Sequence, residues 1–180
     1  MFIMGPAFDW LFGEDENNPP EILVPQLEQD TYYRWLTYLT VPVHYITFLA
    51  VAIWVGTHSL TWWGFIALTV ALGFADGFAI NTGHELGHKR TKVETWLAKI
   101  VLAVPAYGHF WIEHNRGHHR DVATPDDPAS ARMGESIYQF ARREIPGAFH
   151  RAWMLEHERL CRKGVPVWSI HNEVLQSYMI

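Results

Sequence analysis

The chain has 180 residues, of which 49% are apolar, 14% aromatic and 18% charged, and its formal net charge is −5. These values exclude a disordered chain, a collagen and a disulfide-rich scaffold, and the acidic balance argues against a nucleic-acid-binding protein. The one cysteine, Cys161, has no partner for an intrachain disulfide, so nothing in the sequence points to an oxidising compartment.

Residues 1–32 are predicted to form an acidic segment that leads into a membrane. The acidic side chains gather in the turn-rich stretch GEDENNPP at residues 13–20. The first ten residues carry no basic side chain, and the first long apolar run begins too late in the chain for a signal peptide. A cleaved leader is therefore not expected here.

The following segment, residues 33–83, is predicted to be a transmembrane hairpin. No charged side chain occurs from Trp35 to Ala75, a run of 41 residues. A helix that crosses a hydrocarbon core of about 30 Å needs about 20 apolar residues, so the run is long enough for two crossings. We expect spans at residues 33–55 and 60–83, joined by a tight turn at the sequence GTHS.

Two further features of the hairpin fit a membrane. Pro42 lies inside the first span and is expected to kink it. Aromatic residues near the expected span ends resemble an interfacial belt: Tyr32, Tyr33, Trp35, Tyr38, Trp54, Trp62 and Trp63. The alternative is a buried helical hairpin in a soluble protein, but so long an uncharged run is hard to place in a soluble core.

Basic residues predict the orientation of the hairpin. Of the 14 lysines and arginines, only Arg34 precedes the uncharged run, and the other 13 follow it between Lys89 and Lys163. Basic residues favour the cytoplasmic side of a membrane. Both ends of the hairpin, and everything after His84, are therefore expected on the cytoplasmic side.

The rest of the chain is predicted to be helical with one loop. Residues 96–111 are apolar apart from Lys99 and His109, are interrupted by Pro105 and Gly108, and are too short for a span. We expect a buried or interfacial helix there, with His109 as a packing residue. The fold class is accordingly all-α, an integral-membrane helical bundle whose hairpin is followed by cytoplasmic-side helices.

Residues 120–180 are predicted to be cytoplasmic-side helices and the start of a further span. The proline- and aspartate-rich residues 121–128 favour a loop. Residues 135–164 combine apolar positions at helical spacing with many charges, which predicts an amphipathic helix pair interrupted at Pro146 and Gly147. Residues 174–180 resemble the beginning of another membrane helix.

Residues 84–119 hold the candidate metal ligands. His84 and His88 in the motif HELGH are four residues apart, so a helix places both imidazoles on one face. The second motif, HNRGHH, repeats that spacing with His114 and His118 and adds His119. Five clustered histidines indicate a metal site, although imidazole alone suits iron, zinc, copper or nickel.

Two chemistries fit the first motif. HELGH is a literal H-E-x-x-H sequence, in which Glu85 would be the general base of a zinc metalloprotease. That site needs only one further ligand, whereas the second motif offers three. In a di-iron oxygenase or desaturase, the histidines would be shared by two irons, and Glu85 would orient an imidazole. The residues alone leave both readings open.

Other carboxylates could support the metal ligands. Asp76 lies two helical turns before His84, inside the expected second span, where a carboxylate is costly. Asp121, with Asp126 and Asp127 after it, follows the second motif and could accept hydrogen bonds from imidazoles. A solvated turn is the alternative for these three residues.

The chain resembles the integral-membrane alkane hydroxylases of the membrane desaturase and hydroxylase superfamily. The strings that carry the resemblance are NTG before HELGHK, EHNRGHHRDVATPDDPASAR at residues 113–132, GESIYQF at residues 134–140, GEDENNPPE at residues 13–21 and YYRW at residues 32–35. The resemblance covers nearly the whole chain.

The resemblance implies an alkane 1-monooxygenase in the bacterial inner membrane. Such an enzyme hydroxylates the terminal carbon of an n-alkane with O2, at a centre of two iron ions. Electrons come from rubredoxin, which a rubredoxin reductase reduces with NAD(P)H. The resemblance assigns His84, His88, His114, His118 and His119 as iron ligands.

One difference from the family concerns the extent of the chain. The family has about six spans, a third histidine motif and a further histidine ligand, and none of these follows His119. His150, His157 and His171 stand alone. We therefore expect residues 1–180 to be the central part of such a domain, with an incomplete metal centre.

Overall fold

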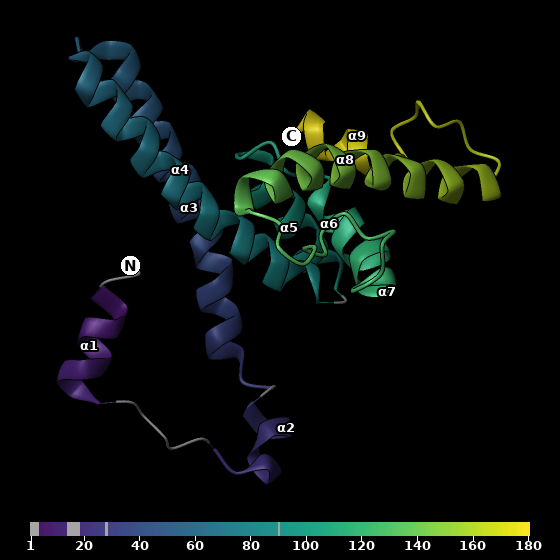
Figure 1. The fold of residues 1–180 in the computed structure, drawn as a ribbon, viewed down its shortest axis with the longest axis horizontal. Coiled ribbons are helices and arrows are strands. Elements are labelled where there is room, and N and C mark those ends of the chain that lie inside the picture. The colour runs from purple at the N-terminus through teal and green to yellow at the C-terminus, as the bar shows by residue number, and fades with distance from the viewer. Residues whose placement is uncertain (1–3, 14–18, 28, 90) are drawn as a thin grey trace. The chain divides into compact units, whose positions relative to one another are not determined.

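The computed structural model describes residues 4–13, 19–27, 29–89 and 91–180. Within those ranges the chain is helical and contains no strand, as the all-α prediction requires. The structure divides into two units, Met1–Trp35 and Leu36–Ile180 (Figure 1). Residues 14–18, which carry most of the predicted acidic stretch, lie outside the described residues.

The first unit consists of short helices with exposed surfaces. Helix α1 spans Met4–Phe12, the 3-10 helix η1 spans Glu21–Leu23 and α2 spans Val24–Leu27. The predicted lead-in therefore contains short helices as well as turns. Residues 5–13 and 19–27 are all exposed, so these helices show no core among the residues whose burial is described.

Two long helices form the predicted hairpin. Helix α3 spans Thr31–Thr57 and α4 spans Trp62–Gly87, each with an apolar window of mean hydropathy 1.7. Only 11% and 6% of these windows are buried, so the helices are unlike the core helices of a soluble protein. Figure 1 shows them side by side along the hairpin. The predicted membrane hairpin is confirmed as two helices able to span a membrane.

The helix ends follow from local chemistry. Thr61 caps α4, because its hydroxyl accepts a hydrogen bond from the backbone N–H of Gly64 at 3.2 Å. Helix α3 continues through Pro42. Helix α4 runs four residues beyond the predicted end at residue 83, and this extra turn carries His84. The second span therefore delivers the first histidine directly.

Beyond the hairpin, two separate helices replace the single helix predicted at residues 96–111. The first is buried, and the second begins after a break in the chain. Helix α5 (Lys92–Ala103) buries Ala98, Val101 and Leu102, which are 0% exposed. The next helix, α6, begins only at Phe110. The chain breaks between them because Pro105 is followed by a residue with positive φ, Ala106 at 54°.

The prediction of an amphipathic helix pair at residues 135–164 is wrong, because the structure has one continuous helix there. Helix α8 spans Ile137–Arg162 with Pro146 inside it. Gly147 serves packing instead of a break, since an added Cβ would lie 2.8 Å from Cβ of Pro128 in the preceding loop. A capping box at Ser136 begins the helix. The predicted loop at residues 121–128 is confirmed from Val122 onward.

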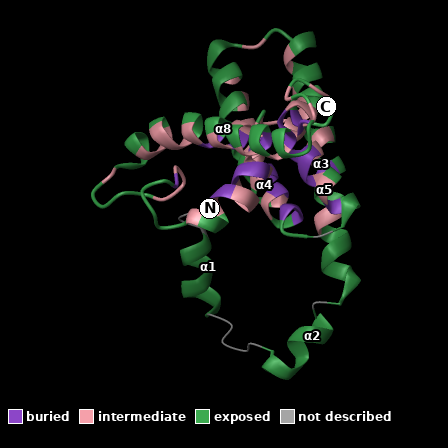
Figure 2. Ribbon diagram, turned by 90° about the vertical axis from the view of Figure 1, so that its right-hand side faces the viewer, coloured by how far each residue is buried: buried purple, intermediate pink, exposed green. Residues whose placement is uncertain are grey.

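The core of the second unit lies between α4, α5 and α8 and the segments that pack on them, and Figure 2 shows the buried residues gathered there. Helix α8 buries a stripe at four-residue spacing, from Ala148 and Ala152 to Glu156 and Leu160. The last helix, α9 (Glu173–Met179), packs on α5 and α8. These contacts fix the surface layer that carries the second histidine motif.

Candidate metal centre

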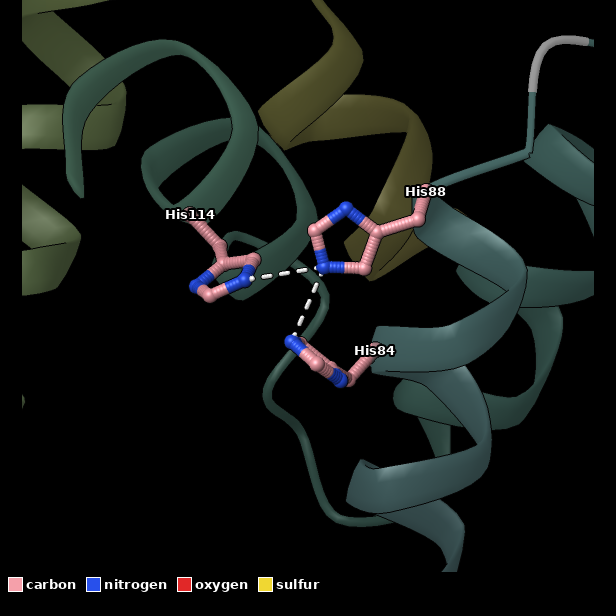
Figure 3. A group of neighbouring side chains, drawn as sticks. All are labelled: His84, His88 and His114. Atoms are coloured by element: carbon pink, nitrogen blue, oxygen red, sulfur yellow. Dashed lines mark hydrogen bonds between the residues drawn. The ribbon is translucent and has the colours of Figure 1, made fainter. Parts of the chain in front are cut away.

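The first two histidines lie at the C-terminal end of the second span. His84 is in the last turn of α4 and His88 is its C-cap. Their Nε2 atoms are 2.9 Å apart, and Figure 3 shows both imidazoles on one side of the helix end. The predicted i, i+4 geometry is therefore present in the structure.

The second motif folds into a π-helix, which differs from the predicted α-helical spacing. Segment η2 spans His114–His118, between α6 (Phe110–Glu113) and α7 (His119–Asp121). The backbone N–H of His119 donates to the carbonyl of His114, five residues earlier. The wider turn brings the Nε2 atoms of His114 and His119 to 3.1 Å. His114 and His119 are therefore the neighbouring donors of this motif.

The two motifs meet through His114. Its Nε2 lies 3.3 Å from Nε2 of His88, and Figure 3 shows His84, His88 and His114 converging. A donor atom from each of these three residues lies within 4.8 Å of the others. Metal–nitrogen bonds of about 2.0–2.1 Å place neighbouring donors about 3.0–3.4 Å apart. The spacing of His84, His88 and His114 therefore fits a shared metal, and His119 adds a donor beside His114.

His118 reaches the same cluster from a different side. Its ring stacks on His114 with centroids 5.2 Å apart, and its Nδ1 lies 2.9 Å from Oδ2 of Asp127. The Asp127 side chain is fully buried, and despite this burial its pKa is lowered, because Ser130, the backbone N–H of Ala129 and His118 hydrogen-bond to it. A carboxylate at Nδ1 leaves Nε2 of His118 as the donor for a metal.

Burial and neighbouring imidazoles favour the neutral form of His114 and His88. Burial, followed by repulsion from the other four motif histidines, lowers the pKa of His114 to about 3. Burial also lowers the pKa of His88, with His84 and His119 adding to the effect. Neutral imidazoles carry the lone pairs that metal binding needs, so few protons compete near neutral pH.

The predicted supporting carboxylates occupy three different places. Glu85 lies 3.4 Å from Nδ1 of His84, on the side of the ring away from the Nε2 cluster. Asp76 lies 3.2 Å from Nε2 of His44 within the hairpin. Asp121 pairs with Arg120 and Arg151. Of the predicted carboxylates, Glu85 and Asp127 are placed beside motif imidazoles, at His84 and His118, whereas Asp76 and Asp121 pair elsewhere.

Several supporting residues escaped prediction. Arg116 bridges Glu156 of α8 and Glu173 of α9, with nitrogen–oxygen distances of 2.6 Å to each. Arg151 of α8 approaches Asp127 and the π-helix. In the sequence these arginines resemble ordinary cytoplasmic charge. The sequence feature that could have indicated a close approach here is Gly117. An added Cβ at this position would lie 2.9 Å from both Nε of Arg151 and Oε1 of Glu113.

A membrane-compatible hairpin that ends in a cluster of histidines from two motifs defines a helical membrane protein whose histidines are spaced as metal ligands can be. The chain matches the fatty acid desaturase family over residues 60–177 and belongs to that family. The matched region includes the second span, both histidine motifs and helices α5 to α8.

Curated relatives narrow the likeness. The chain is 61% identical over 175 residues to an alkane 1-monooxygenase of Pseudomonas putida, which covers 97% of this chain and 44% of the relative. It is 60% identical over 175 residues to alkane 1-monooxygenase 1 of Alcanivorax borkumensis, covering 97% and 43%. A hydroxylase component of a xylene/toluene monooxygenase from Pseudomonas putida is 30% identical over 97 residues, or 54% of this chain and 26% of that protein.

The chain therefore spans less than half the length of the relatives that it matches along nearly its whole sequence. Both histidine motifs, the hairpin and the helices after them lie within this shared region.

Proposed function

We propose that the chain is the central part of an alkane 1-monooxygenase that converts an n-alkane and O2 to a 1-alkanol. The observation that carries the proposal is the imidazole cluster at the end of the second span, in a chain 60–62% identical to alkane 1-monooxygenases. Residues 33–83 serve as the membrane hairpin, residues 84–119 bring the metal ligands and residues 120–180 form the supporting layer.

The metal ligands would be the five motif histidines. The donor set consists of neutral imidazoles, which suits iron. Two iron ions would supply the oxidising power for an unactivated C–H bond, chemistry that side chains cannot provide. The chain's own part is to keep the donors neutral and to orient their rings. The proposed ligands are His84, His88, His114, His118 and His119.

The hairpin offers a path for an alkane from the bilayer. A groove of about 560 Å³ lies between α3 and α4, lined mostly by apolar atoms. Leu39 and Val43 of α3 face Ala75 and Phe78 of α4 across it. Apolar walls bind an alkane by excluding water, and the groove opens toward the surface that lipid would cover. Substrate would therefore approach the cluster from within the membrane.

Electrons would arrive from the opposite direction. We propose that the histidine cluster lies at the cytoplasmic face of a bacterial inner membrane, which the basic residues after the hairpin favour. A soluble carrier could reach it there, and His88 and His119 are exposed. We propose rubredoxin as that carrier, reduced by rubredoxin reductase with NAD(P)H.

The protease alternative gains no support from the site. A zinc protease base must face the metal-bound water, whereas Glu85 lies at Nδ1 of His84 and its side chain is 57% exposed. The two motifs also bring four imidazoles close together. An H-E-x-x-H zinc site needs only one protein ligand besides its two histidines.

The test uses the protein at the full length that its gene encodes, in membranes with rubredoxin, rubredoxin reductase and NADH. Octane should give 1-octanol, and replacing His84, His88, His114, His118 or His119 by alanine should abolish both product and bound iron. His150→Ala and His157→Ala, which change exposed histidines of α8, are the controls and should remain active. Full iron content and activity in all five variants would refute the assignment.

A further inference from the structure

Arg151 of helix α8 gathers several groups around the second histidine motif. Its guanidinium lies 3.3 Å from Oδ1 of Asp127 and 3.7 Å from Oε1 of Glu113, and it also pairs with Asp121. It donates to the carbonyl oxygen of Gly117 at 3.2 Å. The side chain is only 13% exposed. One largely enclosed cation thus contacts three acidic side chains and the π-helix backbone.

The contact with Asp127 reaches a proposed metal ligand. Oδ2 of Asp127 lies 2.9 Å from Nδ1 of His118. The Ser130 hydroxyl and the backbone N–H of Ala129 also donate to this carboxylate. A carboxylate oxygen at this distance accepts a hydrogen bond from Nδ1 of His118, which fixes the ring and leaves Nε2 for a metal. Arg151 is the cation within ion-pair distance of that carboxylate.

The contact with Gly117 reaches the same ligand through the backbone. Gly117 is buried, and an added Cβ would lie 2.9 Å from Nε of Arg151. The glycine therefore lets the guanidinium approach the turn between His114 and His118. Arg151 holds His118 at two points, its imidazole through Asp127 and its backbone through the preceding carbonyl.

We propose that Arg151 is a positioning residue for the metal centre, which sets the orientation and tautomer of His118 through Asp127 and Gly117. The proposal rests on the proposed metal site and concerns a residue that touches neither metal nor substrate. A planar guanidinium serves two carboxylates and a carbonyl at fixed angles, which an ammonium group cannot do. Lysine should therefore keep the charge and lose the positioning.

Arg143 provides a matched control on the same helix. It pairs with Glu135 and donates to the backbone carbonyls of Pro128 and Ser130, at 2.8 Å and 2.9 Å. It thus anchors the same loop with the same kinds of contact, yet it has no hydrogen bond to Asp127 or the π-helix among the described residues. A general loss of loop anchoring would affect both arginines alike.

The experiment compares Arg151→Lys, Asp127→Asn, the double variant and Arg143→Lys in the full-length protein in detergent. Ferrous iron affinity is measured by chelator competition, and cobalt(II) absorption reports the ligand geometry. Losing an outer contact of a metal ligand typically costs about 10–100-fold in metal affinity. We expect that loss and an altered cobalt spectrum for Arg151→Lys and Asp127→Asn, with the double variant no worse than the weaker-binding single variant.

The thermal midpoint of the metal-free protein separates positioning from folding. It should be similar in Arg151→Lys and Arg143→Lys, while Arg143→Lys keeps the parent affinity and spectrum. Equal metal affinity in both lysine variants, or additive losses in the double variant, would overturn the proposal. A parent that binds iron without hydroxylating octane would instead refute the proposed function and leave this test intact.

Discussion

The histidines of the cluster differ in what holds the ring nitrogen that faces away from it. At His84 the neighbour is Glu85, whose side chain is 57% exposed, whereas at His118 it is Asp127, which is fully buried. A buried carboxylate is held by several hydrogen bonds, while an exposed one competes with water. The two carboxylates should therefore contribute unequally to metal binding.

Replacing Glu85 by glutamine tests the exposed member of this pair. We expect iron affinity to fall by about 10-fold or less, at the low end for such outer contacts, with octane hydroxylation falling alongside. Peptidase activity should be absent before and after the change. We would measure iron and zinc content, 1-octanol formation and cleavage of a peptide mixture. Stoichiometric zinc together with peptidase activity in the parent would contradict this prediction.

The buried His109 gives a separate pH prediction. It is 4% exposed, its Nδ1 lies 2.7 Å from the hydroxyl of Tyr178, and burial lowers its pKa to about 4. Because the folded pKa lies below the unfolded value of about 6.5, the stabilisation is complete above pH 6.5 and is lost as the pH falls toward 4. The loss between pH 7.5 and pH 5 should be about 2 kcal/mol.

His109→Gln is the comparison, since glutamine can still bond to Tyr178 but does not titrate. Unfolding in detergent is followed with the metal removed by a chelator, because metal binding itself depends on pH and would add to the effect. The stability difference between parent and variant should shrink on acidification. Parallel pH curves for the two proteins would show that His109 does not carry the effect.

At the scale of elements, hydropathy predicted the two spans, whereas the local register of the later helices could not be predicted from it. The uncharged run predicted both spans, and the spacing of His84 and His88 predicted their shared face. The π-helix was not predictable, because one extra residue in a turn leaves no trace in hydropathy. The continuous α8 was missed because the reason for Gly147, the approach of Pro128, comes from a distant loop.

Glu156 shows the same limit at the buried stripe of α8. It was not expected inside, yet it is 0% exposed and pairs with Arg116 and Arg159. A single sequence shows the charges but not which of them meet. The residues that support the cluster through ion pairs were therefore harder to predict than the histidines, whose spacing is local.

The π-helix makes a prediction about register. Inserting an alanine after Asn115 would place His119 six residues after His114, and each residue of a helix accounts for about 100° of rotation. His119 would then point away from His114, and iron binding should be lost. Asn115→Ala is the control, because it removes only the hydrogen bond from the side chain to the Trp111 carbonyl. Equal iron content in the two variants would contradict the role of the π-helix.

At the scale of the whole molecule, the distribution of basic residues predicts the orientation of the hairpin. A reporter fused after Lys92 should behave as cytoplasmic, because 13 of the 14 basic residues follow the hairpin. The same reporter at Ser59, in the connection between α3 and α4, should lie on the opposite side. Paired alkaline phosphatase and green fluorescent protein fusions provide the measurement. Phosphatase activity of the fusion after Lys92 would show that the hairpin has the opposite orientation. The proposed cytoplasmic route for electrons would then be excluded.

The division of the chain between groove and cluster has an evolutionary consequence. The groove walls come mainly from α3 and from α4 before residue 83, while the histidine donors come from the end of α4 onward. Mutations can therefore reshape the groove without moving a donor nitrogen. Under the proposed function, a lineage could exchange one hydrocarbon substrate for another while the proposed metal ligands stay unchanged. The partial likeness to the hydroxylase component of a xylene/toluene monooxygenase is what such a history would leave behind.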